Sequence, residues 1–259
     1  MDRRTFVTTA GAAAGSLALA GGAAQAQADL MGRDLYELRR YTLRAGERQA
    51  AFDDYLKSAL LPALARLGIG PIGVFKPIAE QPEPLVVLLL THGSPESIAL
   101  GNMVVADPEF AKAAATYLDY PMADPLYKRV ESSLMVAFSG HPHIAVPKLD
   151  QPRIFELRTY ESHNERMAAK KIEMFNSGEI PIFGRCGMPP VFFGQTLAGA
   201  AMPNLTYMLT CPNQEARTAG WKAFGADPDW KVMSGKAEYK DTVSHITSLL
   251  LAPTDFSKV

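Results

Sequence analysis

The chain has few cysteines, almost no net charge and few long apolar runs. Of its 259 residues two are Cys, and 26 Lys and Arg balance 27 Asp and Glu, for a formal net charge of −1. Without an excess of positive charge, neither nucleic acid nor an acidic membrane is expected as a partner. After the N-terminal segment no apolar run reaches the roughly 18 residues that a membrane-spanning helix needs. The mature protein is therefore expected to have no membrane span.

The motifs of several enzyme classes are also missing. The sequence contains no HExxH, no paired Cys/His zinc spacing, no Walker motif and no GxSxG elbow. No CxxCH is present, which excludes covalently attached c-type haem. Gly68–Gly73 (GIGPIG) matches GxGxxG in form, but Pro71 lacks the amide that a phosphate would need, and we interpret the segment as a turn. No metal site is expected, and the sequence favours a non-enzymatic protein without deciding the question.

The first 28 residues have the order of an export signal. Arg3 and Arg4 begin the segment, a mild Ala/Gly/Leu stretch follows, and Ala26-Gln27-Ala28 resembles a cleavage site. The arginine pair followed by Thr5-Phe6 resembles the twin-arginine signal. We therefore expect residues 1–28 to direct export by the twin-arginine machinery, and the mature protein to be periplasmic or secreted.

The remainder of the chain contains one pattern twice. Tyr36–Tyr41 (YELRRY) returns as Phe155–Tyr160 (FELRTY) after 119 positions, and Ala106–Phe110 (ADPEF) returns as Ala226–Trp230 (ADPDW) after 120. Two prolines, an arginine and a glycine between these segments also recur, as Pro62, Arg66, Gly68 and Pro71 against Pro181, Arg185, Gly187 and Pro190. Such an ordered series predicts two copies of one unit. The copies are expected at 33–138 and 153–252, with a linker at 139–152 and a tail at 253–259.

Each copy has the same order of expected elements. In the first, alternation over 35–43 predicts a strand, and apolar residues at helical spacing over 47–66 predict a helix. The apolar runs 72–78 and 85–91 flank a Pro-rich turn and predict a hairpin. A helical region over 95–118 and a strand over 130–138 complete the unit. The corresponding elements of the second copy are expected at 153–160, 164–184, 191–197, 204–210, 213–236 and 242–251.

The order β-α-β-β-α-β is that of a ferredoxin-like unit, in which helices cover one face of the sheet. The other face needs a partner, since a large apolar surface would otherwise meet water. We therefore predict an α+β protein in which two tandem ferredoxin-like units pack sheet to sheet as an intramolecular α/β barrel.

The repeated segments resemble the NIPSNAP family. The resemblance is carried by the E-L-R-x-Y opening of each copy (residues 37–41 and 156–160), by the D-P-[DE]-[FW] segments and by the order of elements. It implies ferredoxin-like domains of the dimeric α/β-barrel superfamily, in which small monooxygenases and haem-binding enzymes also occur. It implies no defined activity, because the biochemical activity of the family is poorly defined.

Strand alternation places a charged set on one face of each copy's first strand. Glu37, Arg39 and Tyr41 share one face, whereas Tyr36 and Leu38 share the other. The second copy repeats this alternation with Glu156, Arg158 and Tyr160. If the apolar face takes the helices, both charged sets point to where the two sheets meet, inside or at the mouth of the barrel. They would form either a paired network that fixes how the copies dock or a pocket for a carboxylate or phenolic ligand.

His92 is the one modest candidate for proton transfer or ligand binding, because it ends an apolar run near the end of a strand. Its counterpart in the second copy is Cys211, so the repeat does not preserve it. A histidine in a solvated loop is the alternative interpretation. No motif supports a cofactor, and haem stays an option that the superfamily alone suggests.

The two cysteines fall at the same end of one predicted hairpin. Cys186 precedes the second strand of the second copy, and Cys211 ends the third. In an exported protein this position would permit a disulfide, and two buried thiols are the alternative.

Three functions remain open from the sequence. The first is an exported protein that binds a small organic molecule in or near the barrel between the repeats. The second is an enzyme of the monooxygenase or haem type, and the third is a structural or interaction module without a ligand. The internal repeat permits a monomer, and the sequence does not decide between a monomer and a higher assembly.

Overall fold

A computed structural model describes residues 32–259, and the predicted export signal lies outside the described residues. Both repeats contain strands, helices and one five-residue π-helical turn. The elements of the first repeat are β1 (Leu35–Thr42), α2 (Glu47–Tyr55), the π-helical turn Leu56–Leu60, α3 (Leu61–Arg66), β2 (Ile72–Pro77), β3 (Leu85–His92), α4 (Pro95–Asn102), a 3-10 turn (Val104–Ala106), α5 (Pro108–Leu118) and β4 (Arg129–Ala137).

The second repeat follows the same order. Its elements are β5 (Ile154–Glu161), α6 (Glu165–Met174), the π-helical turn Phe175–Glu179, α7 (Ile180–Arg185), β6 (Pro190–Ala198), β7 (Asn204–Cys211), α8 (Gln214–Ala226), α9 (Pro228–Ser234), a 3-10 turn (Ala237–Tyr239) and β8 (His245–Pro253). No helix of residues 32–259 is long and apolar enough to cross a membrane.

The strands form one closed antiparallel barrel in the order β1-β3-β2-β8-β5-β7-β6-β4. Each repeat contributes four adjacent strands in the ferredoxin-like order, with its first strand between its third and its fourth. The barrel closes where the repeats meet, through Phe75 of β2 opposite Pro253 of β8 and Val136 of β4 opposite Gln195 of β6. The predicted fold class is confirmed, and residues 33–259 form one compact unit.

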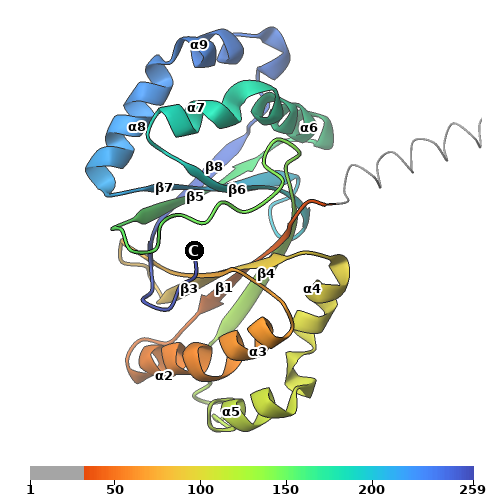
Figure 1. The fold of residues 1–259 in the computed structure, drawn as a ribbon, viewed down its shortest axis with the longest axis vertical. Helices are drawn as coiled ribbons and strands as arrows, with labels where there is room; N and C mark the ends of the chain where they lie inside the picture. The colour runs from red at the N-terminus through yellow and green to blue at the C-terminus, as the bar shows by residue number, and fades with distance from the viewer. Residues whose placement is uncertain (1–31) are drawn as a thin grey trace, which may run out of the picture. The chain divides into compact units, whose positions relative to one another are not determined.

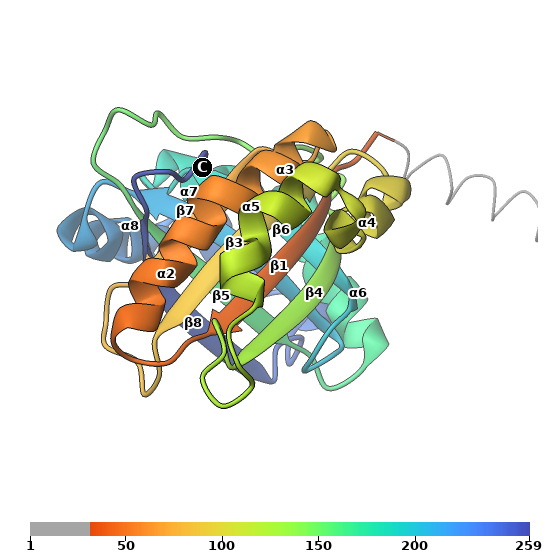
Figure 2. The ribbon, with the colours of Figure 1, turned by 90° about the horizontal axis from the view of Figure 1, so that it is seen from below.

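Helices cover the barrel on two opposite sides (Figure 1). Helices α2, α3, α4 and α5 lie over the strands of the first repeat, and α6, α7, α8 and α9 lie over those of the second. Figure 2 shows the first repeat from the outside, with its helices in front of β1, β3 and β4. The interior of the barrel is therefore the surface that the two sheets share, and each outer face meets its own helices.

The barrel interior is apolar, which corrects the predicted orientation of the first strands. Tyr36 and Leu38 of β1 pack inside with Phe155 and Leu157 of β5, together with side chains from β2, β3, β4, β6, β7 and β8. The charged faces of β1 and β5 point to the helices instead. The barrel interior is enclosed on all sides by strands, so it takes the more apolar face of each strand.

Each helix layer has a core of its own against the outer face of the barrel. In the first repeat Tyr41 packs with Phe52 of α2, Leu88 of β3 and Phe110 of α5. The second repeat builds the corresponding core around Tyr160, Phe175, Phe183, Tyr207 and Phe224. Strand β3 is buried over nearly its whole length, because its alternate residues face the barrel interior and the helices.

The linker and the C-terminal segment occupy matching positions on the two repeats. After β4, the linker residue Ala145 donates its backbone N–H to the carbonyl of Val191 at the start of β6. After β8, Lys258 donates its N–H to the carbonyl of Ile72 at the start of β2. The segment after each closing strand thus makes a backbone hydrogen bond to a strand of the other repeat.

The predicted disulfide is not formed, since Cys186 and Cys211 are both free thiols. Cys186 is half-buried after α7, and Cys211 is buried in the core of the second helix layer. Burial raises the pKa of Cys211 to about 11. Position at the same end of a hairpin does not by itself supply the side-chain geometry of a disulfide.

Gly220 of α8 lies against the end of the preceding helix. A Cβ atom there would meet Met188 Cγ at 2.5 Å and the backbone oxygen of Cys186 at 3.0 Å. Gly101 occupies the matching position on α4, where a Cβ would meet Ile69 Cδ1 at 2.9 Å. Both repeats therefore use a glycine where the second helix approaches the turn after the first.

We predict that Gly220→Ala lowers the free energy of unfolding by about 1–3 kcal/mol, because the backbone oxygen in its way cannot move as a side chain can. Gly225→Ala, on the same helix with nothing within 4 Å of its added Cβ, is the matched control. It should leave stability unchanged or raise it by up to about 1 kcal/mol. Urea unfolding measures both, and equal effects would contradict the packing.

Candidate functional site

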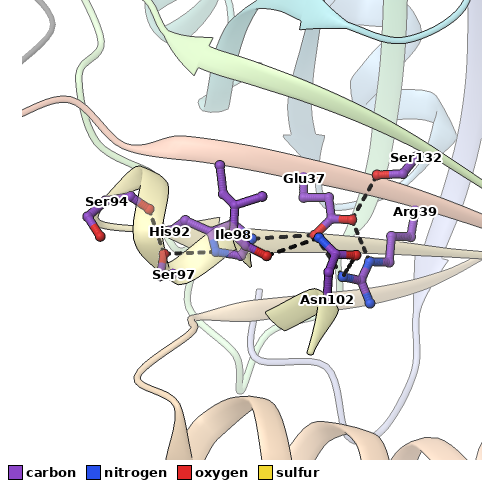
Figure 3. A network of polar contacts seen from close by, with 8 residues as sticks. All are labelled: Glu37, Arg39, His92, Ser94, Ser97, Ile98, Asn102 and Ser132. Atoms are coloured by element: carbon purple, nitrogen blue, oxygen red, sulfur yellow. Dashed lines mark hydrogen bonds and ion pairs between the residues drawn. The ribbon is translucent and has the colours of Figure 1, made fainter. Parts of the chain in front are cut away.

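Glu37 is the centre of a buried polar cluster on the outer face of β1 (Figure 3). Arg39 donates from Nε to Glu37 Oε1 at 2.6 Å and from Nη2 to Oε2 at 2.8 Å. Ser132 of β4 donates its hydroxyl to Oε1 at 2.8 Å. Asn102, at the end of α4, accepts a bond of 3.4 Å from Arg39. The carboxylate and the guanidinium are therefore paired with each other under helix α4.

His92 belongs to the same cluster and is fully buried, which excludes the predicted alternative of a solvated loop histidine. Its Nδ1 lies 3.0 Å from the hydroxyl of Ser97. That hydroxyl donates to the Ser94 carbonyl at 2.7 Å. The other ring nitrogen, Nε2, lies 3.6 Å from Glu37 Oε2.

Glu156 is the centre of the matching cluster on β5. Arg158 donates to Oε1 at 2.7 Å, and Arg217 of α8 donates to Oε2 and Oε1 at 2.6 and 2.7 Å. Trp221 Nε1–H and the Ser248 hydroxyl each donate at 2.7 Å. The carboxylate is therefore held by two guanidinium groups.

The two clusters share a plan and differ in their second cation. Ser132 and Ser248 are equivalent, because each lies opposite the Arg of its cluster on the closing strand. Arg217 has no equivalent arginine in the first repeat, where the His92 ring lies beside Glu37 instead. The second cluster therefore carries two permanent positive charges against one carboxylate, and the first carries one.

Both glutamates are held in the ionised form. Burial alone would raise the pKa of Glu37, but the nearby His92, Arg39 and Ser132 outweigh it and lower the pKa to about 2. Burial acts in the same direction on Glu156, and its hydrogen-bond partners, first of all Arg217, lower its pKa to about 2. Each cluster is thus a closed network that joins a strand to its covering helix.

Tyr41 and Tyr160, the remaining predicted ligand-binding residues, are core residues of the helix layers. Tyr41 packs against Phe52, with ring centroids 4.9 Å apart. Tyr160 accepts a hydrogen bond of 2.8 Å from the Tyr207 hydroxyl. Burial raises the pKa of both Tyr41 and Tyr160. None of the seven predicted residues lines the cavity at the barrel mouth described next.

A cavity of about 310 Å³ opens at the end of the barrel where β1 and β5 finish. Polar side chains from both repeats surround it, and they lie on the inward faces of their strands. They include Arg40, Glu131, Thr159, Glu161, Thr206 and Thr247. The hydroxyls of Thr159 on β5 and Thr206 on β7 form a hydrogen bond of 2.9 Å. The apolar core closes the barrel below this cavity, so the cavity is a mouth rather than a channel.

Arg40 is the cation of this cavity. It is half-buried, and within residues 32–259 no hydrogen bond or ion pair within 4 Å engages its guanidinium. Burial lowers the pKa of Arg40, and the charge of Glu131 opposes this shift. Glu161 supplies a second carboxylate from the other repeat. The mouth can therefore offer one guanidinium, two carboxylates and several hydroxyls to a small polar molecule.

The sequence left a paired network and a ligand pocket open for the charged sets, inside or at the mouth of the barrel. The expected Glu37–Arg39 and Glu156–Arg158 pairs are present, but the prediction placed them on the wrong face of the strands. Arg40 and Thr159 alternate with the residues that were predicted. The sequence did contain a signal for the inward face, because positions 36, 38, 155 and 157 are apolar. By strand alternation, positions 40 and 159 lie on the same face as these. Arg217 and Trp221 gave no comparable signal, since a helix position alone does not show which strand residue it meets.

His92, the candidate that the sequence offers, is not placed to hold a haem. His92 is enclosed, with Nδ1 bonded to Ser97 and Nε2 facing Glu37, so neither nitrogen is directed to a cavity. No group of three or more His, Cys, Asp or Glu side chains in the described part of the chain could hold a metal ion.

Comparison with known proteins matches the NIPSNAP family model to residues 155–258, which lie in the second repeat and the tail that follows it. No curated protein has a sequence similar to that of the chain. For the first repeat, the resemblance to the family stays a prediction from its residues.

Several solved structures have a similar fold. A monooxygenase candidate from Fusobacterium nucleatum subsp. nucleatum has a TM-score of 0.60 at 6% identity, over 85% of this chain and 92% of its own. Another, from Lactobacillus acidophilus, has a TM-score of 0.54 at 11% identity, over 85% and 94%. A NIPSNAP-like domain protein from Burkholderia xenovorans covers 40% of this chain and 88% of its own, with 19% identity and a TM-score of 0.37. The first two share the fold of the whole barrel with this chain.

We predict that Glu156→Gln lowers the free energy of unfolding at neutral pH by about 3 kcal/mol, because it leaves two guanidinium groups without their carboxylate. Glu37→Gln should lower the free energy of unfolding by less, since it leaves only one guanidinium, that of Arg39, without its carboxylate. Urea unfolding of both variants checks the order, and a larger loss for Glu37→Gln would contradict it.

Acid sensitivity tests the same carboxylates. A glutamate whose pKa falls from 4.5 when unfolded to about 2 when folded stabilises the protein above pH 4.5, and this stability is lost as the pH falls to about 2. Each Gln variant should therefore lose part of the acid dependence of the wild type.

Proposed function

We propose that the chain binds a small polar organic molecule at the mouth of the barrel, between its two repeats. The observation that carries the proposal is the cavity around Arg40, whose guanidinium is free of hydrogen bonds and ion pairs to the described residues. An unpaired, half-buried guanidinium is an efficient partner for a carboxylate or another planar anion.

The lining of the cavity supports a ligand with more than one polar group. Glu131 and Glu161 would accept hydrogen bonds from a hydroxyl or an amine, while Arg40 takes the anionic group. The volume of about 310 Å³ lies at the small end of ligand sites. A molecule that carries both an acidic group and a donor group suits this lining best.

A structural module without a ligand is the main alternative, and an oxidising enzyme is the second. The enzyme is supported by the names of fold neighbours at 6% to 11% identity, two monooxygenase candidates and an anthrone oxidase-like protein. The buried clusters favour neither, because their charged groups are engaged with one another. The mouth cavity favours binding over a purely structural role.

We further propose that residues 1–28 direct export by the twin-arginine route, as their Arg3-Arg4 pair and Ala26-Gln27-Ala28 end suggest. Replacing both arginines by lysine should retain the protein in the cytoplasm with residues 1–28 attached. Cell fractionation with N-terminal sequencing measures this outcome. Unchanged export of the lysine variant would contradict the route.

The binding proposal predicts that Arg40→Met abolishes the thermal shift produced by small hydroxy- and amino-carboxylates, screened one by one with the wild-type protein. Losing a charge-assisted contact should weaken binding at least about tenfold. Lys112→Met, which removes an exposed cation from α5 outside the cavity, should leave the shift unchanged. A screen in which no member stabilises the wild type, or in which both variants respond alike, would contradict the proposal.

A further inference from the structure

The helix layer of the second repeat contains a buried ion pair. Lys171 of α6 and Glu179 in the π-helical turn are 4% and 2% exposed, and Lys171 Nζ lies 2.7 Å from Glu179 Oε2. Met174 Sδ lies 3.4 Å from the same nitrogen. Aromatic rings surround it, with the Phe175 and Trp230 centroids 4.7 and 5.4 Å away.

The first repeat shows that the fold does not need this pair. At a displacement of 119 positions, Lys171 corresponds to Phe52 and Glu179 to Leu60, and both of these are buried core residues. Burying two charges costs more than burying two apolar side chains of similar size. The same place in the same fold is thus filled by an apolar pair in one repeat and by an ion pair in the other.

A cavity adjoins the ion pair. It has a volume of about 270 Å³ and lies between α6, α9 and the segment before β8, and Lys171, Trp230, Tyr239 and Asp241 are among its lining residues. In the first repeat, the residues that correspond to Lys171, Met174 and Trp230 are Phe52, Tyr55 and Phe110. Their rings pack together there. The Tyr55 ring centroid lies 5.9 Å from that of Phe52 and 6.3 Å from that of Phe110.

Glu179 is the proton acceptor of the pair. Burial raises the pKa of Glu179, and the charge of Lys171 only partly opposes this shift. A carboxylate with a raised pKa accepts a proton more readily than an exposed one, and Glu179 Oε2 lies 2.7 Å from Lys171 Nζ. Other titratable groups of the described residues lie near the pair. The charge of Glu179 acts to raise the pKa of the Tyr160 and Tyr207 hydroxyls, and Asp241 lines the cavity.

We propose that Lys171 and Glu179 form a second small-molecule site, in which the Lys171 amine condenses with a small aldehyde or ketone to form an imine. A desolvated lysine beside a proton acceptor is the arrangement that makes an amine nucleophilic. The site is separate from the barrel mouth, and its failure would leave the binding proposal there unaffected.

The reaction is balanced without an oxidant or a reductant. Glu179 takes the proton from the Lys171 ammonium, and the amine nitrogen forms a bond to the carbonyl carbon while the carbonyl oxygen takes a proton from Glu179. The nitrogen of the resulting carbinolamine is still protonated and passes one proton through Glu179 to the hydroxyl. The hydroxyl then leaves as water as the carbon–nitrogen double bond forms. In sum, the ammonium and the carbonyl compound give a protonated imine and one water molecule, with the Glu179 carboxylate as its counter-ion.

Reductive trapping tests the site in the full mature protein. Acetaldehyde and sodium cyanoborohydride are added in slightly acidic buffer, the hydride reduces any protonated imine to a stable secondary amine, and peptide mapping locates the modified lysines. An exposed lysine, with a pKa of about 10.4, holds less than about one amine in a thousand in the neutral form under these conditions. We expect Lys171 to be modified at least about tenfold faster than the neighbouring Lys170, which pairs with Glu173 on the helix surface.

Two variants and one control give the proton acceptor its own test. Glu179→Gln keeps an oxygen near Lys171 but cannot take a proton, so modification of Lys171 should fall at least about tenfold. Glu173→Gln, beside Lys170, should leave Lys171 unaffected. The double variant Lys171→Phe/Glu179→Leu copies Phe52 and Leu60 of the first repeat, so it should keep or raise the melting temperature and lose the trapped product at this position.

Two results would overturn the proposal. In the first, the wild-type protein is modified at surface lysines and at its N-terminal amine while Lys171 stays intact. In the second, Lys171 is modified equally fast with Gln at position 179. Because the first result is read on the wild type, it decides the question even if a variant fails to fold.

Discussion

The packing of the two sheets inside one closed barrel is the constraint on which the other features depend. Neither repeat can bury the inner face of its sheet alone, and the pairs β2–β8 and β4–β6 remove the free edges as well. Within residues 32–259, closure leaves no edge strand that could pair with another chain. The interior must then be filled by apolar side chains from every strand, which fixes the direction in which each residue of β1 and β5 points.

The charged residues of β1 and β5 consequently lie in two kinds of place. Glu37 and Glu156 lie outside the barrel, where partners from β4, β8 and the covering helices satisfy their carboxylates. Arg40 and Glu161 lie on the inward faces of their strands at the mouth, where the apolar filling ends. The first group is closed to further partners, whereas the second faces a cavity. This difference, rather than the presence of charge, separates a structural network from a candidate ligand site.

The internal repeat made most of the fold predictable. Hydrophobic periodicity located each strand to within a few residues, and the order of elements implied the barrel. The orientation of the first strands was wrong, because the alternation in YELRRY does not say whether the helices or the barrel interior takes the apolar face. Val86, Leu88 and Leu90 of β3 already supply an apolar surface to the helices, so β1 can place Glu37 and Arg39 there. Comparing the repeats position by position would have revealed Lys171 and Glu179 opposite Phe52 and Leu60, but not that they meet.

A crystal structure of the protein purified from the cells that make it tests the central claim most directly. The account predicts density for a non-protein molecule at the barrel mouth, in contact with the Arg40 guanidinium and with Thr159 or Glu161. Water alone in the cavity, with Arg40 turned into an ion pair with Glu131 or Glu161, would contradict it.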